Sequence, residues 1–172
     1  MIDPTSMSRE LITDFPVTAA LIDLNHHLSD IGYHTLFSRA EGVLHGKVEI
    51  DEEYRASTKC SVYTVESHVT FLKEVLEGET VSISFQMLDL SNKAAHVLMT
   101  LSNGAGDVCA YHECMLLHVK KTPDGPKPYP FGRYQLANLV HVYTKDKELP
   151  RPKKAGTRIA IRRQTTAESA EG

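Results

Sequence analysis

The strongest constraint on the fold of this chain is a segment whose apolar residues recur at helical spacing and which follows a polar turn. In residues 30–45 the apolar side chains recur three and four positions apart, which places them on one face of an α-helix. Ser29 or Asp30 is suited to cap its first turn, and Gly46 is suited to end it. Other elements must cover that face, which consists of Ile31, Leu36, Phe37, Ala40, Val43 and Leu44.

After residue 60 the sequence changes to the period of two that is typical of β-strands. Alternating apolar and polar residues predict four successive strands, at 60–72, 81–87, 94–101 and 108–119. The turns between them are short, which indicates an antiparallel meander. A further strand is expected at 15–20. One long helix before such a sheet predicts an α+β fold in which the helix covers one sheet face.

The alternation in the first of these strands also assigns its two faces. Tyr63, Val65, Val69 and Phe71 are predicted to share the face toward the helix. The other face would then carry the polar residues Thr64, Glu66, His68 and Thr70.

Chain length and proline content divide the 172 residues into one domain and an appended segment. We assign residues 8–121 to the domain. Six of the eight prolines lie beyond residue 122, so 122–130 is predicted to be a rigid linker, followed by a short helix within 131–143. The basic stretch 151–163 is expected to be solvated, and the last eight residues to be disordered.

Composition excludes several classes of protein. The formal net charge of -3 argues against a nucleic-acid partner. No apolar run approaches the ~20 residues of a membrane span, and no signal-peptide pattern opens the chain, so we expect a cytoplasmic protein that binds no membrane. The three cysteines lack Cys-x-x-Cys spacing, and His96, His112 and His118 lack metal-ligand spacing, so neither disulfides nor a metal is expected.

The polar turn carries the residue types that acyl transfer needs. Asp23, Asn25, His27 and Asp30 lie directly before the helix start, where backbone N–H groups have no partner within the helix. A carboxylate can act as a base or nucleophile, and such amides can stabilise a developing oxyanion. No Gly-x-Ser-x-Gly motif, P-loop or dinucleotide fingerprint is present to suggest another chemistry.

These residues carry a family resemblance. The stretch 23–33 (DLNHHLSDIGY) resembles the active-site turn of hot-dog fold acyl-CoA thioesterases of the 4-hydroxybenzoyl-CoA thioesterase class, which have an acid, Gly-His, an Asn pair and a Tyr at these intervals. Residues 63–72 (YTVESHVTFL) are similar to a strand of the betainyl-CoA thioesterase branch, which is linked to carnitine breakdown. The resemblance spans about residues 12–120. Where the family has glycine and the Asn pair, this chain has His26, Ser29 and Asp30.

The resemblance implies a hot-dog fold, in which an antiparallel sheet wraps one long central helix. It implies hydrolysis of betainyl-CoA or a similarly small acyl-CoA without metal or cofactor, coenzyme A being part of the substrate. Asp23 would be the general base or nucleophile, Asn25 and His27 would hold the turn and orient water, and the amide near Asp30 would bind the oxyanion. Glu41 in the helix is the alternative acid.

The same resemblance implies where substrate binds. Tyr33, Tyr63, Phe71 and Glu66, with His68 beside them, would form a cage for the quaternary ammonium of betaine. For Glu66 and His68 an ion pair facing solvent is the alternative. Lys73 or Arg133 would meet the phosphates of coenzyme A at the boundary of a homodimer, or of a dimer of dimers. An aryl or medium-chain substrate, and a non-catalytic thioester-binding protein, stay open as alternatives.

Overall fold

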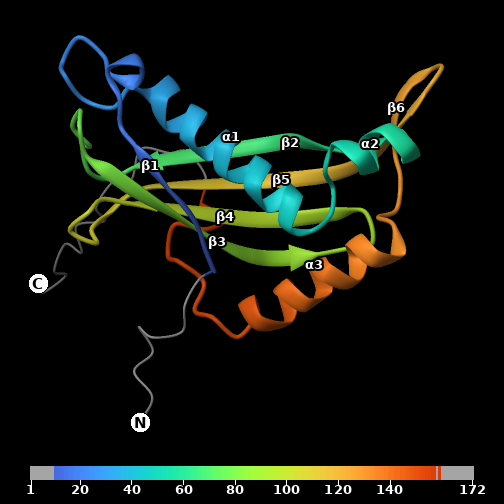
Figure 1. The fold of residues 1–172 in the computed structure, drawn as a ribbon. Coiled ribbons are helices and arrows are strands. Elements are labelled where there is room, and N and C mark those ends of the chain that lie inside the picture. The colour runs from blue at the N-terminus through green and yellow to red at the C-terminus, as the bar shows by residue number, and fades with distance from the viewer. Residues whose placement is uncertain (1–9, 158, 160–172) are drawn as a thin grey trace, which may run out of the picture.

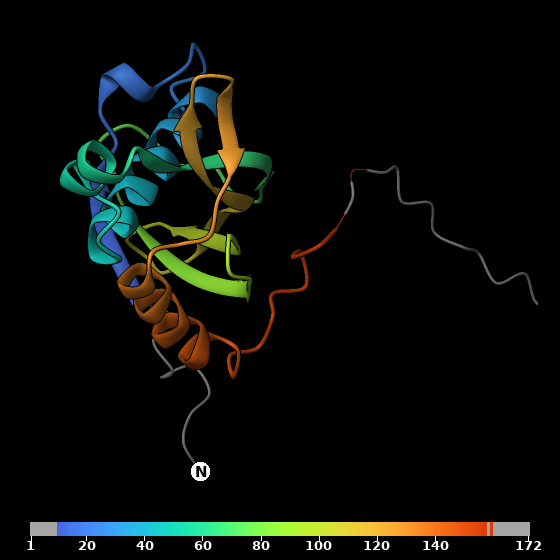
Figure 2. The ribbon, with the colours of Figure 1, turned by 90° about the vertical axis from the view of Figure 1, so that its right-hand side faces the viewer.

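The computed structural model describes residues 10–157 and residue 159. Its longest helix, α1, lies across one face of an antiparallel sheet, and α3 lies along the side of the sheet formed by β3 (Figure 1). Figure 2 shows the same arrangement viewed from the right-hand side of Figure 1. The elements are β1 (Glu10–Pro16), a 3-10 turn η2 (Ala19–Leu21), α1 (Asp30–Lys47), α2 (Glu52–Thr58), β2 (Cys60–Phe71), β3 (Thr80–Leu90), β4 (Ala94–Ser102), β5 (Val108–Thr122), β6 (Gly125–Pro128) and α3 (Arg133–Asp146).

The strand order in the sheet is β1-β3-β4-β5-β2, with β6 paired to β5. All pairs are antiparallel, so the predicted α+β fold is confirmed, and the four predicted strands are present. The predicted meander was wrong for its first strand, because β2 lies at the end of the sheet beside β5 and only β3, β4 and β5 follow one another as neighbours. The first strand lies earlier than predicted. It ends at Pro16, which has no N–H to donate, and residues 19–21 form η2 instead.

The buried face of α1 differs in part from the predicted one. Leu36, Phe37, Ala40 and Leu44 are buried against the sheet as expected, whereas Ile31 is 73% exposed. The predicted end was wrong by two residues, because Gly46 stays within the helix and Glu49 takes the left-handed backbone conformation that ends it. The helix start was predicted correctly, since the Ser29 hydroxyl accepts from the backbone N–H of Gly32.

A β-bulge in β2 reverses the predicted faces of Tyr63 and Thr64, which precede it, whereas the residues beyond it lie on the faces that were predicted. Thr64 pairs with Leu116 and Glu66 with Met115, so Val65 is an extra residue in the ladder. One inserted residue moves everything beyond it to the opposite face. Thr64 therefore lies on the α1 side and Tyr63 on the outer side, while Phe71 is on the α1 side as predicted. A strict period of two cannot reveal such an insertion.

Helix α3 covers the part of β3 that β1 leaves unpaired. β1 pairs with β3 only from Thr80 to Phe85. Beyond that point the Met87 N–H donates to the Asp146 carboxylate (2.7 Å), and Arg151 donates to the Leu88 carbonyl (3.1 Å). An unpaired strand edge can recruit another strand, and these bonds protect it.

The segment predicted to be a linker contains β6, which pairs with β5 between Val119 and Thr122. The helix expected within 131–143 corresponds to α3. Of the basic stretch, residues 151–157 and 159 are described, and the tail predicted to be disordered, 165–172, lies outside the described residues.

Several properties follow from the described part of the chain. None of its helices is long and apolar enough to cross a membrane. Within the same residues no group of histidine, cysteine and acidic side chains could hold a metal ion. All three cysteines are buried free thiols, in agreement with the sequence analysis.

A buried histidine lies between α1 and the sheet. His112 is 5% exposed and contacts the ring of Phe37, with 5.0 Å between centroids. Neither of its ring nitrogens has a hydrogen-bond partner among the described residues. Burial lowers the pKa of His112 to about 4, and that of His45 likewise. Both side chains are therefore neutral in the folded protein at pH 7.

Replacing His112 by leucine is expected to flatten the dependence of stability on pH. Between pH 6.5 and about 4 the unfolded chain binds a proton at His112 and the folded one does not, so the parent loses up to about 1.4 kcal/mol per pH unit through this group as pH falls. Urea denaturation at several pH values measures the slope. The difference between His112→Leu and the parent isolates this histidine, and His141→Gln, which changes an exposed histidine, is the control. Identical slopes for parent and His112→Leu would contradict the assignment.

Candidate active site

The turn before α1 is closed around the carboxylate of Asp23. The Asp23 N–H donates to the His27 carbonyl (2.9 Å), and the His26 N–H donates to the Asp23 carbonyl (3.1 Å). The carboxylate accepts from the N–H groups of Asn25 (2.8 Å) and His27 (3.3 Å). The Asn25 amide is the main cause that lowers the pKa of Asp23. The carboxylate is therefore ionised at neutral pH and held in a fixed orientation.

His26 occupies the position where the resembling family has glycine, and its φ is 61°. This left-handed conformation is costly for a residue with a Cβ, by about 1 kcal/mol or more. The turn thus keeps the geometry that glycine would allow without that cost.

His26→Gly is expected to stabilise the protein by about 0.5–1 kcal/mol, because glycine relieves the left-handed strain. Thermal unfolding measures the change. Leu24→Gly is the matched control, since Leu24 is 98% exposed in the same turn but has no positive φ, and it should not stabilise. Equal effects of the two substitutions would contradict the strain at His26.

The first turn of α1 leaves one backbone amide without an acceptor in the described chain. The Gly32 N–H donates to the Ser29 hydroxyl, the Tyr33 N–H to the Ser29 carbonyl, and the Ile31 N–H to the Asp30 carboxylate. The Asp30 N–H has no such bond. It remains a donor at the positive end of the helix, where an anion is stabilised.

Gly32 lets the turn approach the helix. A Cβ at this position would lie 2.5 Å from the Leu21 carbonyl oxygen and 2.6 Å from a methyl carbon of Leu28. The Leu21 carbonyl also accepts from the N–H and hydroxyl of Ser29. No larger residue fits without moving backbone, so Gly32 sets the position of the helix start relative to Asp23.

Gly32→Ala is expected to destabilise the protein by about 2 kcal/mol, because the added methyl group overlaps backbone. Gly42→Ala in the same helix is the matched control. A Cβ there meets nothing within 4 Å, so alanine should stabilise by about 0.5–1 kcal/mol through helix propensity. Chemical denaturation of both variants tests this, and a neutral Gly32→Ala would show that the approach is not tight.

A pocket of about 340 Å³ opens between the turn, the first turn of α1 and the residues that follow β2. The Leu28 N–H donates to the Val75 carbonyl (2.8 Å), and the Tyr33 hydroxyl donates to the Lys73 carbonyl (3.0 Å), which holds these segments together. Burial raises the pKa of Tyr33 to about 12, so its hydroxyl stays protonated as a donor. The pocket is lined by Asp23, His27, Leu28, Asp30, Tyr33, Phe71, Leu72, Lys73 and Glu74.

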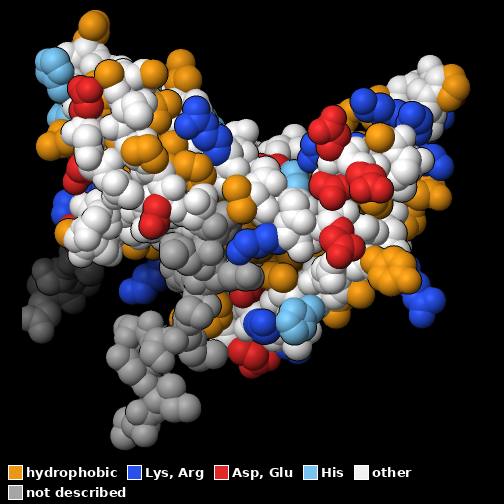
Figure 3. Space-filling model, viewed as in Figure 1, with side chains coloured by type: hydrophobic (Ala, Val, Ile, Leu, Met, Phe, Trp, Pro, Cys, Tyr) orange, Lys and Arg blue, Asp and Glu red, His pale blue; other side chains and the backbone are white. Residues whose placement is uncertain are grey.

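This end of the molecule is at the upper left of Figure 3, where apolar, acidic and histidine side chains lie beside one another. Five of the predicted site residues line the pocket, namely Asp23, His27, Asp30, Tyr33 and Phe71. Asn25 does not line it and instead donates to Asp23 from within the turn. The rings of Tyr33 and Phe71 meet edge to face at 5.1 Å.

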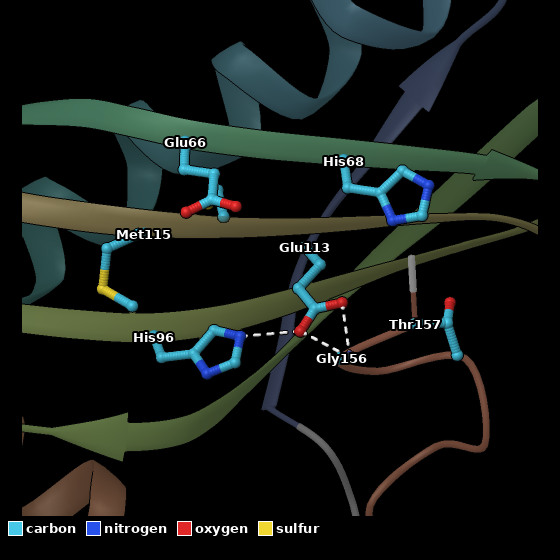
Figure 4. A pocket seen from close by; sticks show the side chains of 8 residues that line it. Glu66, His68, His96, Glu113, Met115, Gly156 and Thr157 are labelled. Atoms are coloured by element: carbon cyan, nitrogen blue, oxygen red, sulfur yellow. Dashed lines mark hydrogen bonds and ion pairs between the residues drawn. The ribbon is translucent and has the colours of Figure 1, made fainter. Parts of the chain in front are cut away.

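The other three predicted residues lie elsewhere, so the predicted cage does not form within this chain. Glu66 and His68 project from the outer face of the sheet, the face that their alternation predicted, and there they line a separate pocket with His96 and Glu113 (Figure 4). There His96 bonds the Glu113 carboxylate at 2.7 Å. Tyr63 pairs with Leu117 on that same outer face.

Glu74 also lines the pocket, although no feature of the sequence predicted it. Its carboxylate lies 3.5 Å from Nε2 of His27. Lys73, expected to meet phosphates, lies in the pocket with its ammonium bound to Asp107. The bond between Leu28 and Val75 brings these residues to the turn, and no local pattern indicates that long-range pairing.

The alternative acid, Glu41, lies outside the pocket. Its carboxylate accepts from the Thr64 hydroxyl at 3.2 Å, and burial raises its pKa. Arg133, the other candidate for the phosphates, lines a different pocket with Tyr54 of α2.

Solved structures define the class of fold. The hypothetical protein SAV2348 from Staphylococcus aureus, solved in complex with CoA, superposes with a TM-score of 0.82 at 23% identity, over 91% of this chain and 99% of that one. A putative thioesterase from Pseudomonas putida KT2440 superposes with a TM-score of 0.79 at 27% identity, over 92% of this chain and 100% of that one. The antiparallel sheet wrapped around one central helix is thus the hot-dog fold of thioesterases, as predicted.

Residues 17–139 match the model of the thioesterase-like superfamily, and the chain belongs to that family of thioester hydrolases. It is 35% identical to the betainyl-CoA thioesterase of Pseudomonas aeruginosa over 90% of its length and 98% of that protein. It is also 29% identical, over 88% of its length, to the L-carnitine dehydrogenase/betainyl-CoA thioesterase of Rhizobium meliloti, of which it spans 30%.

Proposed function

We propose that this hydrolase acts on betainyl-CoA or a similarly small acyl-CoA, in the pocket beside Asp23. The proposal depends on one observation: Asp23, with its ionised carboxylate, lines the same pocket as Asp30 at the start of α1, whose N–H has no acceptor among residues 10–157. The similarity to betainyl-CoA thioesterase over nearly the full length of both chains supports the choice of substrate. A pocket of about 340 Å³ lies at the small end of ligand sites, which favours a short acyl group.

The proposed chemistry begins with the thioester carbonyl next to Asp23. As general base, Asp23 takes a proton from water while the hydroxide oxygen bonds the carbonyl carbon. As nucleophile, its carboxylate attacks that carbon directly, and water later hydrolyses the anhydride. In both routes the C–S bond breaks, and coenzyme A leaves as a thiolate that takes up a proton.

The amide of Asp30 is proposed to stabilise the oxyanion of the tetrahedral intermediate. One such donor lowers the barrier by about 3 kcal/mol. Asn25 and His27 act in this proposal by holding Asp23 through their backbone N–H groups, at 2.8 and 3.3 Å. No metal or cofactor enters either route.

We further propose a cytoplasmic homodimer formed along β2. This strand of 12 residues ends the sheet, and among the described residues it pairs only with β5, which leaves its other edge without a neighbouring strand there. Val65 is 55% exposed and Phe71 50% exposed along it. A long edge with apolar side chains favours pairing with a second copy, which would extend the sheet across a twofold axis. A dimer of dimers is a further assembly of the same pair.

Asp23→Asn is expected to lower kcat for betainyl-CoA at least a hundredfold, because the amide can neither take a proton from water nor attack the carbonyl. Release of free thiol measures turnover, and thermal unfolding confirms that the variant folds. Asp14→Asn, an exposed carboxylate on β1, is the control and should match the parent.

The parent chain assayed on a thioester panel separates the alternatives. Faster hydrolysis of aryl or medium-chain thioesters than of betainyl-CoA would replace the proposed substrate. Binding without turnover, unchanged in Asp23→Asn, would overturn the catalytic role.

A further inference from the structure

The pocket beside Asp23 carries an excess of negative charge. Three of its lining residues are carboxylates, Asp23, Asp30 and Glu74, and one is an ammonium, Lys73. That ammonium is already bound to a fourth carboxylate, Asp107, at the rim. The Asp107 carboxylate, which lies outside the pocket lining, compensates the charge of Lys73. Lys73 therefore does not neutralise the carboxylates within the pocket.

This charge decides which end of an acyl-CoA can enter. The nucleotide end carries phosphates, which carboxylates repel. The acyl end carries no negative charge, and in betainyl-CoA it carries a permanent positive one. The acyl group therefore enters the pocket, while the phosphates stay outside.

The pocket also offers an aromatic surface, and Glu74 lines the same pocket. Phe71 is half exposed, and Tyr33 fixes its ring through the edge-to-face contact. The Tyr33 hydroxyl is in turn bound to the Lys73 carbonyl, directly before Glu74. A cation over an aromatic face with a carboxylate nearby is stabilised by both. Quaternary ammonium groups are recognised in this way, since they cannot donate hydrogen bonds.

We propose that Glu74 and Phe71 make this pocket selective for acyl groups bearing a permanent positive charge, with Glu74 as the main determinant of specificity. The inference rests on the proposed function and deepens it. Glu74 is placed for this role by His27, whose ring lies 3.5 Å from its carboxylate, and by the tie between Val75 and Leu28. Glu74 takes the role that was predicted for Glu66, which lies on the outer face of the sheet and lines a different pocket.

Two thioesters of equal shape test the proposal. Betainyl-CoA and 3,3-dimethylbutanoyl-CoA differ only in nitrogen against carbon at the branched centre, so the ratio of their kcat/KM values isolates the charge. The parent is expected to favour betainyl-CoA at least about tenfold, and Glu74→Gln to reduce that ratio about five- to tenfold at low salt. Glu77→Gln removes a carboxylate from the nearby exposed turn, outside the pocket lining, and should leave the ratio as in the parent.

A second variant keeps the test decisive if Glu74→Gln folds poorly. Phe71→Leu retains an apolar side chain but removes the aromatic face, and should lower the ratio about threefold. A parent that hydrolyses betainyl-CoA with a ratio near one, or a ratio unchanged in both variants, overturns this inference and leaves the proposed function standing. Hydrolysis of neither thioester by the parent overturns the proposed function, and this inference with it.

Discussion

The close approach of the Asp23 turn to the first turn of α1 is the constraint on which the site depends. Gly32 permits it, and the Leu21 carbonyl fixes it by accepting both the N–H and the hydroxyl of Ser29. Because Ser29 also caps the helix, the same residue sets where the helix amides begin and where the turn lies. Asp23, whose carboxylate is held by backbone N–H groups, and Asp30, the first residue of the helix, thereby come to line one pocket. The proposed chemistry would depend on this backbone geometry as much as on side chains.

Much of the fold could be predicted, since it follows from local periodicity. The long helix, its Ser29 cap and the four-strand run are all visible in the spacing of apolar residues. The faces of Tyr63 and Thr64 in β2 could not be predicted together with those of the residues beyond them, because Val65 is an extra residue in a pattern that otherwise alternates. The end of α1 was misjudged for a related reason. Glycine permits a helix to stop but does not compel it, and here Glu49 takes the left-handed conformation.

The candidate site likewise has one half that could be predicted from the sequence and one half that could not. The half contributed by the turn, Asp23, His27 and Asp30, is contiguous in sequence and could be predicted. The other half is contributed by the residues after β2, and its position depends on the long-range bond between Leu28 and Val75. Glu74 could therefore not be predicted from the sequence. At His26 the sequence and the backbone conformation can be compared directly. The resembling family has glycine at this position, and His26 itself takes the positive φ that glycine adopts without a steric cost.

The most direct measurement of the central claim is a crystal structure with an unreactive analogue of betainyl-CoA in which a methylene group replaces the thioester sulfur. The account predicts that the ketone oxygen accepts from the Asp30 N–H, that its carbonyl carbon faces the Asp23 carboxylate, and that the trimethylammonium group lies between Phe71 and Glu74. An analogue whose acyl end occupies the outer-face pocket of Glu66 and His68, with the Asp23 pocket empty, would contradict it.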